Sequence, residues 1–198
     1  MTYRIGYLVG SLSSTSVNRT VARALVGLAP PELELVEIGI RDLPLYSPDY
    51  DDDYPPQGRA IKEAVEASDG ILFVSPEYNR SIPGALKNAI DWASRPWGTN
   101  SFARKPTGIV GASIGAIGTA VMQSSMRSVL SFLNAPQLNA PEVYLTFHPE
   151  HYADDGAGGI TVTHEDTATF LRHYMSEYTA FVERVLSVTA PGHIGDPS

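Results

Sequence analysis

The chain has 198 residues, a formal net charge of -8 and no cysteine. The missing cysteines exclude disulfide bonds, thiolate nucleophiles and metal centres held by cysteine, and the negative charge argues against nucleic acid as a main partner. No apolar run approaches the roughly 18 residues of a membrane span, and no signal peptide precedes the first predicted strand. We therefore expect a cytoplasmic protein with no membrane or nucleic-acid partner.

Strand and helix patterns alternate along the chain. Apolar runs predict buried strands, and apolar residues at intervals of three and four predict helices. In chain order, the expected elements are a strand at 3–10, a helix at 16–28, a strand at 33–38, a helix at 57–68, a strand at 70–75, a helix at 82–93, a strand at 107–113, a helix at about 119–133 and a strand at 142–146. Pro30 and Pro31 end the first helix, and residues 39–56 form a loop rich in Asp, Pro and Tyr.

One more helix is expected after the last strand. Residues 148–160 are predicted to form a loop, and Thr163 with Asp166 three residues later is typical of a capping box that starts a helix. The apolar face of this helix consists of Phe170, Tyr174, Tyr178, Phe181 and Val185. The Gly/Pro-rich tail at 191–198 is expected to fray, which leaves residues 1–190 as a single domain.

Five strands that alternate with helices predict an α/β fold in which helices cover both faces of a doubly wound parallel sheet. The chain length suits the flavodoxin-like strand order 2-1-3-4-5. Such sheets bind ligands at the carboxyl ends of strands 1 and 3, where the strand order reverses. The loops expected at that point are residues 10–18 and residues 76–81.

The loop at 10–18 reads GSLSSTSVN and leads into the first helix. Hydroxyl, amide and backbone N–H groups at a helix N-terminus suit a phosphate, through both their donors and the helix dipole. The loop matches neither the P-loop pattern nor G-x-G-x-x-G, which disfavours a nucleotide P-loop and a Rossmann dinucleotide site. An ordinary Ser/Asn-rich turn with a helix cap is the alternative interpretation.

The stretch at 76–92, PEYNRSIPGALKNAIDW, is the most informative in the chain. It follows a buried strand, and Pro76, Pro83 and Gly84 shape its turn and limit its freedom. Such a turn can leave backbone groups free to face a planar ligand, so it suits a flavin ring. Tyr78 lies in the turn itself, whereas the nearby Trp92 is more typical of a core residue.

Residues 111–115 read G-x-S-x-G at a strand-to-helix turn, which is the nucleophile-elbow pattern of serine hydrolases. A serine hydrolase is therefore an alternative function, with Ser113 as nucleophile. The later carboxylates and histidines that such a triad could use are Asp154, Asp155, His164 and His173. The other interpretation is that Gly115 and Gly118 let the backbone approach a ring or a neighbouring helix.

No metal site is predicted. The acidic run at 49–54 matches no EF-hand spacing and is more typical of a solvated loop. His148 and His151 lie close together but lack the third ligand that a zinc site usually needs.

With these motifs in place, the chain resembles the NADPH-dependent FMN reductase family, which includes chromate, quinone and azo-dye reductases. The resemblance covers residues 3 to about 146. It rests on Gly10-Ser11-Leu12 with Ser16 and Asn18, on Pro76-Glu77-Tyr78-Asn79 with Ser81, Pro83-Gly84, Leu86-Lys87-Asn88 and Asp91-Trp92, and on Ser113, Gly115 and Gly118. The second of these groups is long and specific.

The resemblance implies FMN as cofactor, with NADPH or NADH as the hydride donor. Its phosphate would lie on Ser11, Ser16 and Asn18, in the loop that also contains Ser13 and Val17. Its ring would lie against Pro76, Glu77, Tyr78 and Asn79 and against the turn of Ser113, Gly115 and Gly118. The hydride chemistry would belong to flavin N5, so no protein acid or base would be obligatory.

The same resemblance implies a small-molecule electron acceptor, such as a quinone, free flavin, azo dye or metal oxyanion. It also implies a homodimer or a tetramer, with the flavin near the subunit interface. A flavodoxin-like electron carrier or FMN-binding module without turnover is the remaining alternative.

The loop at 10–18 contains no basic residue. Members of the family often carry an arginine where this chain has Ser13, and Arg19 follows only on the helix. We therefore expect the protein to lose part of its FMN on purification. We also expect Ser13→Arg to tighten FMN binding and to make it more sensitive to salt.

Overall fold

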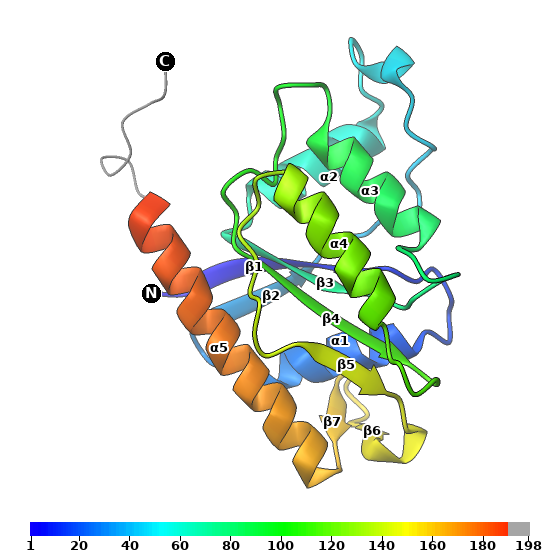
Figure 1. Cartoon of the computed structure of the whole chain (residues 1–198), viewed down its shortest axis with the longest axis vertical. Coiled ribbons are helices and arrows are strands. Elements are labelled where there is room, and N and C mark those ends of the chain that lie inside the picture. The colour runs from blue at the N-terminus through cyan, green and yellow to red at the C-terminus, as the bar shows by residue number, and fades with distance from the viewer. Residues whose placement is uncertain (190–198) are drawn as a thin grey trace.

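The computed structural model describes residues 1–189, which form a five-stranded parallel sheet with helices on both faces (Figure 1). The strands are β1 (Tyr3–Val9), β2 (Leu33–Glu37), β3 (Gly70–Val74), β4 (Thr107–Ser113) and β5 (Val143–Thr146). Their order is β2-β1-β3-β4-β5, and every neighbouring pair is parallel. The predicted flavodoxin-like, doubly wound fold is therefore confirmed, while the predicted frayed tail at 191–198 lies outside the described residues.

The main helices are α1 (Val17–Leu28), α2 (Pro56–Glu66), α3 (Gly84–Ser94), α4 (Ala120–Phe132) and α5 (Glu165–Thr189). α1 and α5 cover one face of the sheet, and α2, α3 and α4 cover the other (Figure 1). β1, β3 and β4 are buried on both faces, as expected from their apolar runs, whereas β2 is a more exposed edge strand. None of the helices in residues 1–189 is long and apolar enough to cross a membrane.

The predicted apolar face of α5 packs onto the sheet. Tyr174, Tyr178, Phe181 and Val185 are buried, and Phe170 is partly buried against the same core. The Tyr178 hydroxyl donates to the carbonyl of Ile71 at 3.0 Å, so the buried phenol is satisfied.

Two predicted helix starts need correction, those of α3 and α5. α3 begins at Gly84 rather than 82, because Pro83 takes an extended conformation (φ -54°, ψ 138°) and acts as the cap. The capping box at Thr163 does not form. The Thr163 hydroxyl donates instead to the Glu150 carbonyl at 3.0 Å, and His164 caps α5 because its Nδ1 accepts the Thr167 N–H at 3.4 Å.

The predicted loop at 148–160 is a short 3₁₀ turn (Pro149–His151) and most of a small hairpin. Its strands β6 (Tyr152–Asp154) and β7 (Ile160–Val162) are antiparallel. The strands have three residues each, too few for an alternating pattern to reveal them. The Phe147 and Tyr152 rings stack with centroids 4.9 Å apart, which fixes the hairpin beside the end of β5.

Three histidine rings lie together where this hairpin meets α5. The rings of His151 and His164 lie parallel with centroids 4.0 Å apart, and His148 lies 4.9 Å from His151. Burial, His164 and His148 together lower the pKa of His151 below its ordinary value of 6.5. Among residues 1–189, no three His, Asp or Glu side chains are arranged to hold a metal ion.

We predict that acid loosens this corner of the protein. Since the pKa of His151 is lower in the folded state, its contribution to stability is complete above about pH 6.5 and is lost as the pH falls through the lowered value. His164 is one of the causes of this lowered pKa, and its ring stacks on that of His151. The melting temperature of the wild type should therefore be lower at pH 5.5 than at pH 7.5.

The matched variant is His164→Asn, which keeps a capping side chain and removes one imidazole. Its melting temperature should depend less on pH over the same range. Equal slopes for the two proteins would contradict the prediction.

Candidate functional site

Three loops meet at the carboxyl edge of the sheet. They follow β1, β3 and β4, and two of them line a cavity of about 510 Å³. The lining residues are Glu77, Asn79, Arg80, Ser113, Gly115, Ala116, Ile117 and Gly118. The cavity thus brings together predicted site residues that are more than thirty positions apart in the sequence.

The loop after β1 is held by its own hydroxyls. The Ser11 Oγ accepts the Ser13 N–H at 3.3 Å, and the Ser13 Oγ accepts the Thr15 N–H at 3.2 Å. Ser16 is the N-cap of α1, since its Oγ accepts the Arg19 N–H at 3.3 Å. Val17 is the first residue of α1, so its N–H lies outside the hydrogen-bond ladder of the helix.

The loop after β3 turns back on itself at residues 78–81. Tyr78 and Ser81 exchange two backbone hydrogen bonds, of 3.1 and 2.9 Å. Asn79 (φ 50°) and Arg80 (φ 63°) between them both have positive φ, as a type I′ turn requires. Asn tolerates this conformation, but it is strained for arginine, and such strain is concentrated at functional sites.

Tyr78 joins this turn to the loop after β1. Its side chain is half exposed, and its hydroxyl lies 3.5 Å from the Ser11 Oγ. Pro76 begins the turn, where its carbonyl accepts the Ser75 hydroxyl at 3.0 Å. The first and second loops are therefore in direct contact.

Glu77 ties the second loop to α4. Its carboxylate, 7% exposed, accepts the N–H groups of Val121 at 3.0 Å and Met122 at 2.9 Å in the first turn of α4. It also pairs with Arg80 at 2.8 Å. Burial raises the pKa of Glu77, but the hydrogen bonds and the Arg80 guanidinium outweigh burial and lower it overall. The carboxylate is thus held charged at a helix N-terminus, where the dipole favours it.

Asn18 does not face the loop. Its side chain is buried, with 1% exposed, and makes two hydrogen bonds of 2.9 Å with the backbone N–H and C=O of Ala112 in β4. The side-chain amide fastens the N-terminus of α1 to β4 and so positions the loop. That Asn18 also contacts the phosphate stays a prediction, which its backbone N–H in the first turn of α1 could serve.

The turn after β4 carries no catalytic triad. The Ser113 Oγ accepts the Gly115 N–H at 3.1 Å, and within residues 1–189 no hydrogen bond joins Ser113 to a histidine. Asp154 and Asp155 bind N–H groups of their own loop, and His164 caps α5. In the part of the chain that the structure describes, the G-x-S-x-G pattern therefore lacks the partners that a hydrolase needs.

Glycine is needed at position 118 for its backbone and its packing. Gly118 has a φ of 61°, and a Cβ there would lie 3.0 Å from the carbonyl carbon of Tyr144 in β5. Gly115, by contrast, lines the cavity, where an added Cβ would meet only the Ser113 Oγ, at 3.6 Å. The two glycines thus serve close backbone packing and an open cavity wall.

Comparison with known proteins identifies the family. The model of the NADPH-dependent FMN reductases matches residues 3–150. The chain belongs to the NADPH-dependent FMN reductase family. It is 47% identical to a 2-hydroxy-1,4-benzoquinone reductase of a Burkholderia species over 92% of this chain and 97% of that protein. It is 41% identical to a quinone reductase of Pseudomonas putida, over 91% of this chain and 95% of that protein.

A solved structure of a flavoenzyme has the same fold. A flavoenzyme NAD(P)H:(acceptor) oxidoreductase from Paracoccus denitrificans superimposes with a TM-score of 0.87 at 39% identity, over 92% of this chain and 98% of that one. As a member of the NADPH-dependent FMN reductase family, the chain is an oxidoreductase whose cofactor is FMN and whose reductant is a nicotinamide nucleotide.

Arg41 reaches the loop after β1 through a contact that the sequence did not reveal. It lies in the segment after β2, and its guanidinium donates to the carbonyl of Leu12 in the loop after β1. Arg19, the nearer cation in sequence, turns away and pairs with Glu37 at 2.6 Å. No sequence motif points to Arg41, because only the pairing of β1 with β2 brings the segment after β2 close to the loop after β1.

For this reductase we predict that Ser113→Ala keeps its activity. The Ser113 hydroxyl supports only the Gly115 N–H, so its loss should cost about 1 kcal/mol or less of stability and change NAD(P)H oxidation less than about threefold. Steady-state assays of both proteins with one quinone test this. Loss of an esterase activity in Ser113→Ala, together with no reductase activity in the wild type, would favour the hydrolase interpretation instead.

Proposed function

We propose that the protein is an NAD(P)H-dependent quinone and flavin reductase whose FMN lies across the three loops. The observation that carries this proposal is the cavity of about 510 Å³ between the second and third loops. Its size is in the range of cofactor sites, and the N-terminus of α1 lies at the adjoining loop. The names of the quinone reductase relatives support a quinone as acceptor.

The residues present fit FMN. Ser11, Ser13 and Ser16 place hydroxyls beside the N-terminus of α1, a donor set that suits a phosphate. The backbone at Tyr78 and Asn79 and the turn from Ser113 to Gly118 offer two walls for a flat ring. When bound, FMN would take hydride at N5 from NADPH or NADH and pass electrons to the acceptor.

The mouth of the cavity suits an aromatic acceptor. Ile117 lines the cavity and is 52% exposed, and its neighbour Ile114 is 84% exposed. Apolar side chains at this position would contact the ring of a quinone or of free flavin, and Arg80 lies on the opposite wall. The same surface would discriminate weakly between acceptors, since apolar contacts lack direction.

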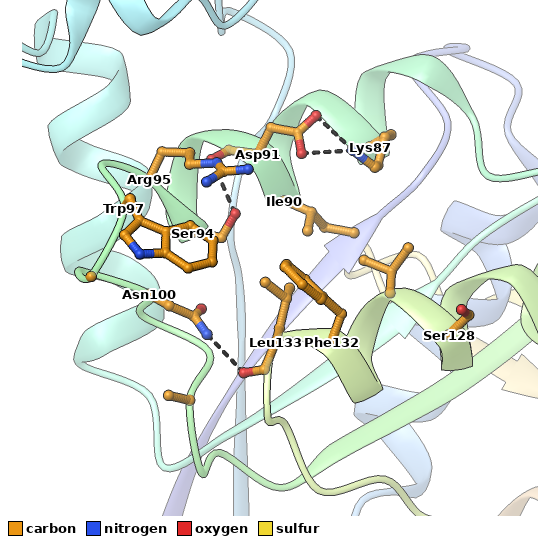
Figure 2. A pocket seen from close by; sticks show the side chains of 13 residues that line it. Lys87, Ile90, Asp91, Ser94, Arg95, Trp97, Asn100, Ser128, Phe132 and Leu133 are labelled. Carbon is orange, nitrogen blue, oxygen red and sulfur yellow. Dashed lines mark hydrogen bonds and ion pairs between the residues drawn. The ribbon is translucent and has the colours of Figure 1, made fainter.

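We further propose that two copies pair through a groove between α3 and α4. The groove, of about 580 Å³, is lined by Trp97 and Phe132, which are 76% and 71% exposed with ring centroids 6.3 Å apart. Figure 2 shows both rings turned into the groove, with the Lys87–Asp91 ion pair at one end. Exposed aromatics of this size typically mark an interface. Light scattering should give a homodimer or tetramer, and Phe132→Glu should give a monomer.

The deciding experiment is the visible spectrum and turnover of the full chain. Purified protein should retain FMN through gel filtration and oxidise NADPH or NADH when a quinone or free flavin is added. Double-reciprocal plots should be parallel if reductant and acceptor share one site. Bound FMN without any NAD(P)H oxidation would favour an electron carrier instead.

A cytoplasmic location, expected from the missing cysteines, is tested by cell fractionation.

A further inference from the structure

The phosphate loop that we propose has no cation of its own. Residues 10–18 contain no Lys or Arg, and the Arg19 side chain is occupied by Glu37. A phosphate carries close to two negative charges at neutral pH. Neutral hydroxyls and a helix dipole stabilise such a charge less than a charge-assisted hydrogen bond does.

Arg41 is the cation that reaches this loop. It follows Ile38 and Ile40, which are both buried, so the segment alternates and its exposed positions include Arg41. The Ile38 N–H donates to the Tyr7 carbonyl at 2.8 Å, which anchors the segment beside β1. Within residues 1–189, the Arg41 guanidinium bonds the Leu12 carbonyl and makes no ion pair.

The peptide between Leu12 and Ser13 links the Arg41 contact to the Ser13 N–H. This peptide is trans, since the cis peptides of the described residues lie elsewhere, so its C=O and N–H point in opposite directions. With Arg41 on the carbonyl, the Ser13 N–H is directed to the other side, where it meets the Ser11 Oγ at 3.3 Å. The Ser11 Oγ in turn lies 3.5 Å from the Tyr78 hydroxyl. A cation at the carbonyl end of a peptide strengthens the donor at its N–H end.

We propose that Arg41 is a positioning residue for the cofactor phosphate. It acts through the Leu12–Ser13 peptide, which it orients so that the Ser13 N–H donates to the Ser11 Oγ and the Ser11 hydroxyl proton is left free for the phosphate. It also supplies the positive charge that the loop lacks. This inference rests on the proposed FMN site, and it predicts that Arg41 supports binding of the phosphorylated flavin more than binding of riboflavin, which has the same ring and no phosphate.

The test compares FMN and riboflavin binding by flavin fluorescence, with the full chain freed of flavin. Arg41→Gln should weaken FMN binding about tenfold and leave riboflavin binding within about twofold. Arg41→Lys, which keeps the charge, should recover part of the FMN affinity. Arg19→Gln is the matched control, since it removes the same charge beside the same loop but has no bond to Leu12. Its ratio of FMN to riboflavin affinity should match the wild type.

Equal losses of FMN and riboflavin affinity in Arg41→Gln would overturn the inference, because they would mean general support of the fold. Unchanged affinities would overturn it too. If Arg41→Gln does not fold, Arg41→Lys still decides, since it keeps the charge but loses the planar guanidinium and should weaken FMN binding more than riboflavin binding. Wild type that binds neither flavin would refute the proposed function itself, whereas a wild type that binds both equally well would refute only the role of Arg41.

Discussion

Glu77→Ala is expected to lower the free energy of unfolding by about 2–4 kcal/mol, because it removes two charge-assisted hydrogen bonds and an ion pair at once. For a domain of this size, the melting temperature should fall by about 5–12 °C. The second loop and α4 would lose the group that joins them, so FMN affinity should fall about tenfold or more. Thermal melts and fluorescence titration measure the two effects.

Two control variants separate the parts of this effect. Glu77→Gln keeps an oxygen for the N–H groups of Val121 and Met122 but loses the charge. Its free energy of unfolding should therefore lie between those of the wild type and Glu77→Ala. Arg80→Gln removes only an exposed partner and should cost less than about 1 kcal/mol. A Glu77→Ala protein as stable as Arg80→Gln would show that the cap on α4 is unimportant.

The same carboxylate predicts a pH dependence. Because the folded state lowers the pKa of Glu77, its contribution is present above the ordinary value of 4.5 and is lost as the pH falls through the lowered one. Glu77→Gln, which cannot titrate, should therefore lose less stability on acidification than the wild type.

Asn18→Ala is expected to be the second large effect, at about 2–4 kcal/mol of stability. Its side chain makes two buried hydrogen bonds with Ala112, 94 residues away in the sequence. Without it, a buried N–H and a buried C=O of β4 lose their partner, which costs more than the net value of the bonds. The N-terminus of α1 should also loosen, so FMN binding should weaken along with stability.

The matched control is Asn139→Ala. Asn139 is exposed and accepts only from Arg127, at 3.2 Å, so its loss should cost less than about 0.5 kcal/mol. Denaturant unfolding of both variants gives the comparison. If Asn18→Ala unfolds with the midpoint of the wild type, then Asn18 does not fasten α1 to β4.

The fold was largely predictable because each main element has a strong local signal. The runs at β1, β3 and β4 are apolar throughout, as buried parallel strands must be, and Ser16 marks the start of α1 as a capping side chain. The hairpin of β6 and β7 was not predicted, because its strands are too short to show the alternation of apolar and polar residues that marks a strand. The predicted cap of α5 was wrong because two neighbouring side chains, those of Thr163 and His164, can each cap a helix at this point.

The candidate site was predictable in composition but not in the roles of its residues. Glu77 and Asn18 belong to recognisable motifs, yet the sequence cannot say that one caps α4 and the other fastens β4. Both roles depend on partners more than forty residues away. Ser113 shows the converse case, because a five-residue pattern matched that of a hydrolase, and no histidine within residues 1–189 bonds the serine.

By itself, the amino-acid sequence determined the order of the main elements, the sheet topology and the two loops, at 10–18 and 76–81, that meet at one edge. These follow from hydrophobic period and turn chemistry, which are local. Only the tertiary structure decided that Arg41 bonds Leu12, that Glu77 serves α4 and that His151 stacks on His164. These contacts join residues that the chain separates, and their energies depend on distance and burial, which no local pattern encodes.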